Sequence, residues 1–228
     1  IFKQENLIDK ITKYNFLIFL VSFQLLFFFS DFSLYAQTFS LDGNGVTIKC
    51  SGCSDGDTGI VGGLTYTAYD NASIAAKAIS DTDWDRVVTT LVTDMSSLFE
   101  NEDTFNQDIS SWDTSNVTKM DKMFKGATLF NQPLNSWTVS NVDDMDAMFQ
   151  GATDFDQPLN GWDVSSVDDM DAMFREATAF NQPLNSWTVS NVTTMSRMFQ
   201  GATDFDQPLN GWDVSSVRYM QFLFRDSN

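Results

Sequence analysis

Carboxylates and one pair of cysteines are the residues of this chain whose chemistry could make a functional site. The 228 residues include 31 acidic and 13 basic side chains, for a net charge of -18, and no histidine. Without histidine, the chain lacks the usual general base near neutral pH and the commonest metal ligand. Catalysis would have to rest on carboxylates. Because the net charge repels phosphate backbones and anionic bilayers, we expect no nucleic-acid partner.

Six aspartates stand in two clusters at corresponding places of two similar segments, and we call them the acidic strip. They are Asp143, Asp144, Asp146, Asp168, Asp169 and Asp171. We predict that they are a candidate ligand-binding surface, either for calcium or for a basic partner. The clusters lack the glycine-containing D-x-D-x-D-G spacing of a calcium loop, so no metal ligand is assigned and calcium is kept only as a candidate cofactor. The interpretation that we favour is instead a solvated, well-capped first helical turn, where the helix dipole favours acids, with the ligand-binding surface as its alternative.

The carboxylates do not indicate a catalytic pair. Such a pair is normally unique, with one acid held in an apolar setting. Here Asp154 has a counterpart at Asp204, and Asp156 has one at Asp206. We therefore assign no catalytic residue and expect no enzyme, with a carbohydrate-active enzyme as the alternative.

The two cysteines form the motif CSGC at Cys50 and Cys53. A zinc site needs further Cys or His ligands, which the chain does not have. A redox dithiol is expected at the start of a helix, whereas Gly, Ser and Asp surround this motif. In an exported protein the pair is more simply a structural disulfide that closes a loop.

Tandem repetition with a period of about 25 residues dominates the chain from residue 88 onward. Identical residues at identical places in successive units are what a stacked core requires, because each unit can bury its large side chains only against its neighbours. A ligand groove lined by Met and Phe is the alternative. The predicted core positions are Trp112, Trp137, Trp162, Trp187 and Trp212; Phe124, Phe149, Phe174 and Phe199; and Met120, Met145, Met170 and Met195.

Each unit is expected to contain one short helix and one short strand. Val117, Met120 and Phe124 have the spacing of one helix face, with a Ser-Asn pair before them as the N-cap and a glycine such as Gly126 after them. The second half of the unit, residues 130–140, holds a proline and a short apolar run that suits a strand. Stacked glutamines, such as Gln132 and its counterparts, are expected to bond along the coil axis rather than bind ions.

Two further segments precede the repeats. Residues 1–36 have lysines, an apolar run of 14 residues and a small residue near the end, which is typical of a cleaved signal peptide, with an uncleaved anchor as the alternative. After cleavage we expect no membrane insertion. Residues 37–87 predict two hairpins and a short helix over residues 71–79 with Asn71 as its cap, and together they form a small β-rich cap with the CxxC motif. Whether this region also binds a partner stays open.

The repeated motif M-x-x-M-F-x-x-A-x-x-F-N-Q followed by W-x-V-S-N-V resembles the repeat of the BspA-type leucine-rich-repeat surface proteins, a unit also found in mycoplasma surface lipoproteins. The resemblance covers about residues 46–224 and implies an α/β repeat solenoid of the leucine-rich-repeat kind. It also implies a secreted or cell-surface bacterial protein that recognises or adheres to extracellular proteins or glycans. A purely structural surface spacer is the alternative. The chain departs from the family in having no lipid-anchor cysteine.

Overall fold

A computed structural model describes residues 36–227 of the chain. The chain divides into two units, Ile1–Ala36 and Gln37–Asn228, and the description below concerns the second unit. The predicted signal segment, residues 1–36, lies outside the described residues apart from Ala36, and so does the alternative of an uncleaved anchor.

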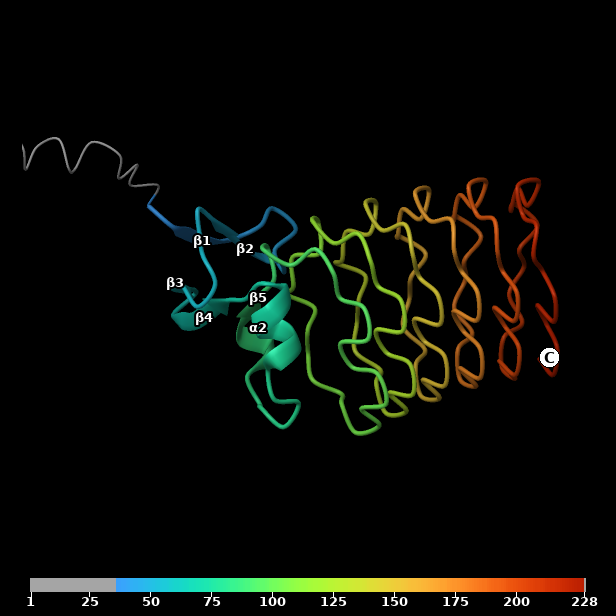
Figure 1. Cartoon of the computed structure of the whole chain (residues 1–228), viewed down its shortest axis with the longest axis horizontal. Coiled ribbons are helices and arrows are strands. Elements are labelled where there is room, and N and C mark those ends of the chain that lie inside the picture. The colour runs from blue at the N-terminus through green and yellow to red at the C-terminus, as the bar shows by residue number, and fades with distance from the viewer. Residues whose placement is uncertain (1–35, 228) are drawn as a thin grey trace, which may run out of the picture. The chain divides into compact units, whose positions relative to one another are not determined.

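Both predicted hairpins of the N-terminal region are present (Figure 1). The strands are β1 (Thr38–Leu41), β2 (Ile48–Ser51), β3 (Thr58–Val61), β4 (Leu64–Ala68) and β5 (Val87–Val88). β1 pairs with β2 in one antiparallel sheet, while the second sheet has the order β3-β4-β5, with β5 parallel to β4. Gly62 and Gly63 form the β3–β4 turn with φ of 59° and 83°, a backbone conformation that suits glycine.

The short helix α2 (Asn71–Ala76) is present, and its N-cap lies one residue earlier than predicted. Asp70, rather than Asn71, is the N-cap, because its carboxylate accepts hydrogen bonds from the backbone N–H groups of Ala72 and Ser73. The 3₁₀ turn η1 (Trp84–Arg86) follows and leads directly into β5.

The repeats form stacked coils, and residues 89–227 contain no helix and no strand longer than an isolated bridge (Figure 1). The prediction of an α/β solenoid of the leucine-rich-repeat kind, with one short strand and one short helix per coil, is therefore wrong. The chain instead runs through successive turns, and each coil is hydrogen-bonded to the next. Donor and acceptor are separated by one repeat, as between Thr118 N–H and Thr93 O (2.8 Å).

Alternating use of the backbone N–H groups explains why no helix forms. Met123, Lys125 and Ala127 each donate to the carbonyl three residues earlier in their own coil. The residues between them donate to the next coil, as Phe124 does to Met148 O at 2.9 Å. A helix would direct every N–H along its own axis to the fourth preceding carbonyl and would leave none for the neighbouring coil.

Two residues per coil have positive φ, which also interrupts any helix. The first position holds Lys122, Ala147, Ala172 and Arg197, with φ between 52° and 59°. The second holds Gly126, Gly151, Glu176 and Gly201. The sequence indicated the second position through its recurring glycine, whereas the first carries ordinary side chains and gave no such signal.

The parallel ladder also lies in a different segment from the predicted one. Bridges connect Asp94, Lys119, Asp144, Asp169, Thr194 and Tyr219 in succession. This column belongs to the half of the unit predicted as helix. The half predicted as strand forms turns, such as the one closed by Trp137 N–H and Leu134 O at 3.1 Å. The Asn of the predicted N-cap pair donates to the preceding coil instead, as Asn141 Nδ2 does to Ser115 O at 2.7 Å.

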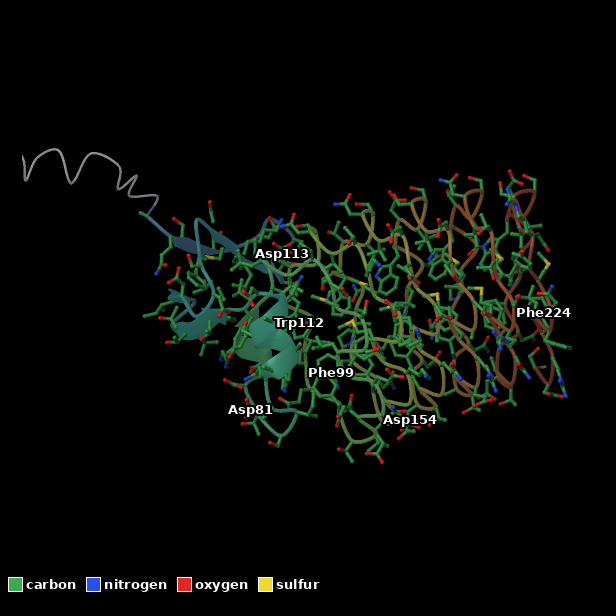
Figure 2. The ribbon with its side chains drawn as sticks, viewed as in Figure 1. Asp81, Phe99, Trp112, Asp113, Asp154 and Phe224 are labelled. Atoms are coloured by element: carbon green, nitrogen blue, oxygen red, sulfur yellow. A yellow bond between two sulfur atoms is a disulfide. The ribbon has the colours of Figure 1, made fainter. Side chains whose placement is uncertain are left out.

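The core consists of aromatic and methionine columns that run along the stack (Figure 2). Of the predicted core positions, all are buried, at 4% exposure or less, except Trp212, which is partly buried. Phe124 and Phe149 stack with centroids 5.5 Å apart, and this spacing recurs along their column. The indole N–H of each of the five periodic tryptophans donates to a carbonyl one coil earlier, as Trp162 Nε1 does to Leu134 O at 3.0 Å.

Trp84 begins the repeat register, although it breaks the tryptophan period. It lies one full repeat before Ile109, and its carbonyl accepts the Trp112 indole N–H at 3.1 Å, as the carbonyl of Ile109 accepts that of Trp137. The Trp84 ring packs against Phe99, Phe105 and Trp112. The end of the N-terminal region therefore acts as part of a coil and covers the first one.

Candidate functional site

The structure brings the six residues of the acidic strip together on two adjacent coils. Asp144 and Asp169 are partners in the parallel ladder, and Asp168 N–H donates to Asp143 O at 3.0 Å. Asp143 and Asp168 are exposed, whereas the other four side chains are partly buried. The strip is thus a continuous carboxylate surface that crosses the boundary between coils.

Each cluster is shaped by a local carboxylate-to-backbone turn rather than by a helix. Asp144 Oδ1 accepts the Asp146 N–H at 3.0 Å, and Asp169 Oδ1 accepts the Asp171 N–H at 2.8 Å. Aspartate favours this turn because its short side chain reaches the backbone two residues ahead. The interpretation of the strip as a first helical turn is therefore wrong, because residues 89–227 contain no helix.

Two carboxylates of the strip, Asp146 and Asp171, are neutralised by basic residues that the sequence analysis did not single out. Lys122 Nζ lies 3.2 Å from an Asp146 oxygen, and Arg197 Nη2 lies 2.7 Å from an Asp171 oxygen. The hydrogen bond to Asp146 is the main cause that raises the pKa of Lys122. Lys122 and Arg197 occupy the same column of the repeat, three coils apart, so the alignment of the repeats could have placed them beside the strip.

Asp144 and Asp169, the members of the strip that pair in the parallel ladder, form no ion pair within the described residues. Burial raises the pKa of Asp144 above its ordinary value, and the nearby Asp121 and Asp146 carboxylates add to the shift. Burial likewise raises the pKa of Asp169, and the repulsion from Asp144 and Asp146 contributes. These two side chains are therefore the part of the strip that would gain most from a cationic partner.

The geometry does not assemble a metal centre or a catalytic pair. Within residues 36–227, no group of three or more Asp, Glu, Cys or His side chains is arranged to hold a metal ion. The strip can act chemically as an anionic surface that offers oxygen acceptors. Calcium binding at the acidic strip stays a prediction.

The amide column on another face of the coils serves packing. Gln132 Nε2 donates to Asn106 Oδ1 at 2.9 Å, and the same Oδ1 accepts the Asn131 N–H at 3.0 Å. The pattern recurs in the following coils, with Asn131, Asp156 and Asn181 as the acceptors. As expected, the glutamines bond along the coil axis, although their acceptors are Asn and Asp side chains rather than other glutamines.

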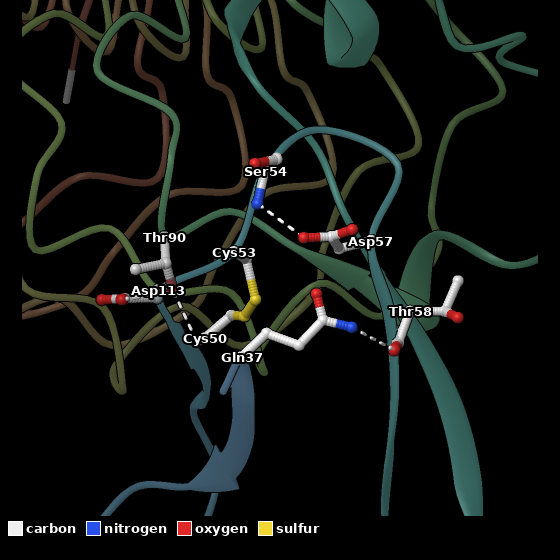
Figure 3. The surroundings of a disulfide bond; sticks show 8 residues. All are labelled: Gln37, Cys50, Cys53, Ser54, Asp57, Thr58, Thr90 and Asp113. Atoms are coloured by element: carbon white, nitrogen blue, oxygen red, sulfur yellow. Dashed lines mark hydrogen bonds between the residues drawn. A yellow bond between two sulfur atoms is a disulfide. The ribbon is translucent and has the colours of Figure 1, made fainter. Parts of the chain in front are cut away.

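Cys50 and Cys53 are joined by a disulfide at the end of β2 (Figure 3). No helix follows the motif, and Asp57 accepts the Ser54 N–H at 2.8 Å close to it. The motif therefore has no helix N-terminus beside it that would stabilise a reactive thiolate. Among the described residues, no helix is long and apolar enough to cross a membrane.

A comparison with known protein families matches the chain over two overlapping stretches, residues 66–181 and 135–228. Both match the family described as "Mycoplasma protein of unknown function, DUF285". No curated protein and no solved structure matched the chain. The two stretches cover the repeats and the last part of the N-terminal region, well over half of the chain, and so the chain belongs to this family of Mycoplasma proteins of unknown function.

Proposed function

We propose that the chain is an exported, non-enzymatic bacterial surface protein whose coils recognise extracellular proteins or glycans. The observation that carries the proposal is the acidic strip, a partly buried carboxylate surface repeated on adjacent coils and only partly neutralised. Such a surface binds a partner with regularly spaced positive charges, because each coil presents the same column of atoms at the same spacing.

The resemblance of the repeated motif to BspA-type surface proteins supports the same function, although the strand-helix fold implied by that resemblance is not retained. Export rests on the predicted signal segment, residues 1–36. A structural spacer without a partner is the second candidate, and the extensive bonding between coils favours it as much as it favours recognition.

Binding of the full chain to arrays of glycans and matrix proteins tests the proposal, at two salt concentrations and with and without calcium. We expect hits that weaken at high salt, because the surface is anionic. The variant Asp144→Asn/Asp169→Asn should lose these hits, whereas the matched control Asp154→Asn/Asp204→Asn, which removes two exposed charges elsewhere, should keep them. Silence on both arrays would support the spacer.

A further inference from the structure

The Cys50–Cys53 disulfide lies where the chain leaves the β1–β2 sheet for the second sheet (Figure 3). Cys50 is buried at 4% exposure, while Cys53 is partly exposed. Gly52 between them has a φ of 71°. The bond therefore closes a four-residue turn with one sulfur in the interior and the other nearer to solvent.

The turn holds β2 against the first coil. The backbone N–H of Cys50 donates to Thr90 Oγ1 at 3.1 Å, and Thr90 Oγ1 donates to Asp113 Oδ2 at 2.8 Å. Two residues before Cys50, the N–H of Ile48 donates to Ser111 O at 2.8 Å. Both bonds come from the same edge of β2, so a change in the position of Cys50 affects the whole contact.

The apolar cluster under β2 is small and separate from the core of the coils. Its buried members are Ile48, Cys50, Tyr66 and Val88, with Phe39, Cys53 and Val61 packed against them. The two cysteines thus supply part of the cluster itself. A cluster of this size contributes little burial, so it depends strongly on a covalent cross-link.

We propose that the disulfide is a redox-sensitive latch that keeps the β1–β2 sheet on the first coil. The acceptors that β2 would leave behind, Thr90 Oγ1 and Ser111 O, can bond to water, so opening does not strand them. The coils have their own core and their own hydrogen bonds, and they stay folded when the latch opens.

The reductant is a dithiol such as dithiothreitol. Its thiolate attacks Cys53 Sγ, the more exposed sulfur, and the S–S bond breaks with Cys50 Sγ leaving as a thiolate that takes up a proton. The second thiol of the reductant then attacks the mixed disulfide and releases the Cys53 thiol. Two electrons pass to the cysteine pair, and the reductant leaves as a cyclic disulfide.

Hydrogen exchange of the full chain, with and without dithiothreitol, tests the latch. We expect the amides of residues 38–51 to exchange at least about tenfold faster in the reduced protein, because local opening sets their protection. Amides of residues 119–151 should stay within about twofold under the same principle. The variant Cys53→Ser should exchange rapidly in residues 38–51 without reductant and should not respond to it.

Two results would overturn the proposal. Unchanged exchange in residues 38–51 after reduction, with free thiols confirmed by mass, would show that the sheet does not need the bond. Faster exchange in residues 119–151 as well would show that the disulfide supports the whole stack instead of a local latch.

Discussion

At position 176 the chain places a glutamate where the aligned positions 126, 151 and 201 carry glycine. Glu176 has a φ of 59°, close to the 70° of Gly151 and Gly201. A side chain with a Cβ pays about 1 kcal/mol or more for this conformation. The ion pair between Glu176 and Arg175, at 2.9 Å, is largely exposed and offsets little of that cost.

Replacing this glutamate should therefore stabilise the protein. We expect Glu176→Gly to raise the free energy of unfolding by about 1 kcal/mol, as measured by urea denaturation. The control Gly151→Ala should lower it by a similar amount, because the nearest atom to the added Cβ is 3.8 Å away and only the positive φ is penalised. A loss of stability in Glu176→Gly would contradict the assignment of strain to this position.

The raised pKa of Asp169 gives a pH dependence with a definite sign. The folded state binds this proton more tightly than the unfolded state does. The free energy of unfolding therefore falls as pH rises from the ordinary pKa of an aspartate through the raised pKa of Asp169 in the folded state. Asp169→Asn should thus be more stable than the parent at pH 7, and the difference should vanish at about pH 3.

The substituted amide keeps an oxygen for the Asp171 N–H, so the local turn survives. Thermal unfolding across this pH range measures the effect. Subtracting the control Asp154→Asn, which removes one exposed charge from the same acidic molecule, isolates the local contribution. Equal pH profiles for the two variants would refute the prediction.

At the scale of elements, the coil differs from the predicted strand and helix although its buried positions were recognised. Val117, Met120 and Phe124 have helical spacing, but consecutive three-residue turns place the same positions on one side. The sequence therefore predicted the columns and the buried face. It could not predict the backbone, because ordinary residues such as Lys122 hold positive φ only through bonds to the next coil.

The acidic strip shows the same division. The alignment of the two clusters was enough to expect them on neighbouring coils, since a fixed period places equal positions one above the other. Their separation into neutralised and unpaired carboxylates depends on Lys122 and Arg197, whose reach to Asp146 and Asp171 follows from the turn geometry. The prediction of the fold class was wrong because contacts between coils determine the backbone conformation, and sequence periodicity alone does not reveal those contacts.

The indole hydrogen bonds give each coil a specific dependence on the one before it. Trp162→Phe keeps an aromatic ring in the column but removes the indole N–H that bonds to the buried Leu134 carbonyl, which then keeps only the backbone N–H of Trp137. We expect the free energy of unfolding to fall by about 0.5–1.5 kcal/mol for the lost hydrogen bond, with a further loss from the smaller ring. In Trp212→Phe the fall should be smaller, because that residue is only partly buried and water can replace the donor. Equal losses in urea denaturation would argue against this account.

For the whole molecule, the register of the repeats is the decisive constraint. Deleting residues 143–167 joins Val142 to Asp168 and restores every column, so the shortened protein should still unfold cooperatively with a lower free energy of unfolding. Deleting residues 143–162 instead removes less than one full repeat and shifts all later columns against their partners. Circular dichroism and urea denaturation should then show a loss of cooperative unfolding. Similar behaviour of both deletions would mean that the register does not hold the stack together.

The bonds between coils also determine how the protein responds to tension. Each coil is hydrogen-bonded only to its neighbours along the stack, so a force applied at residues 37 and 227 separates one coil at a time instead of shearing the whole core. Each released coil adds about 85 Å of extended chain, at roughly 3.4 Å per residue. A pulled molecule therefore lengthens in equal steps while its remaining coils stay folded. Each step lowers the tension that the molecule transmits between its two ends.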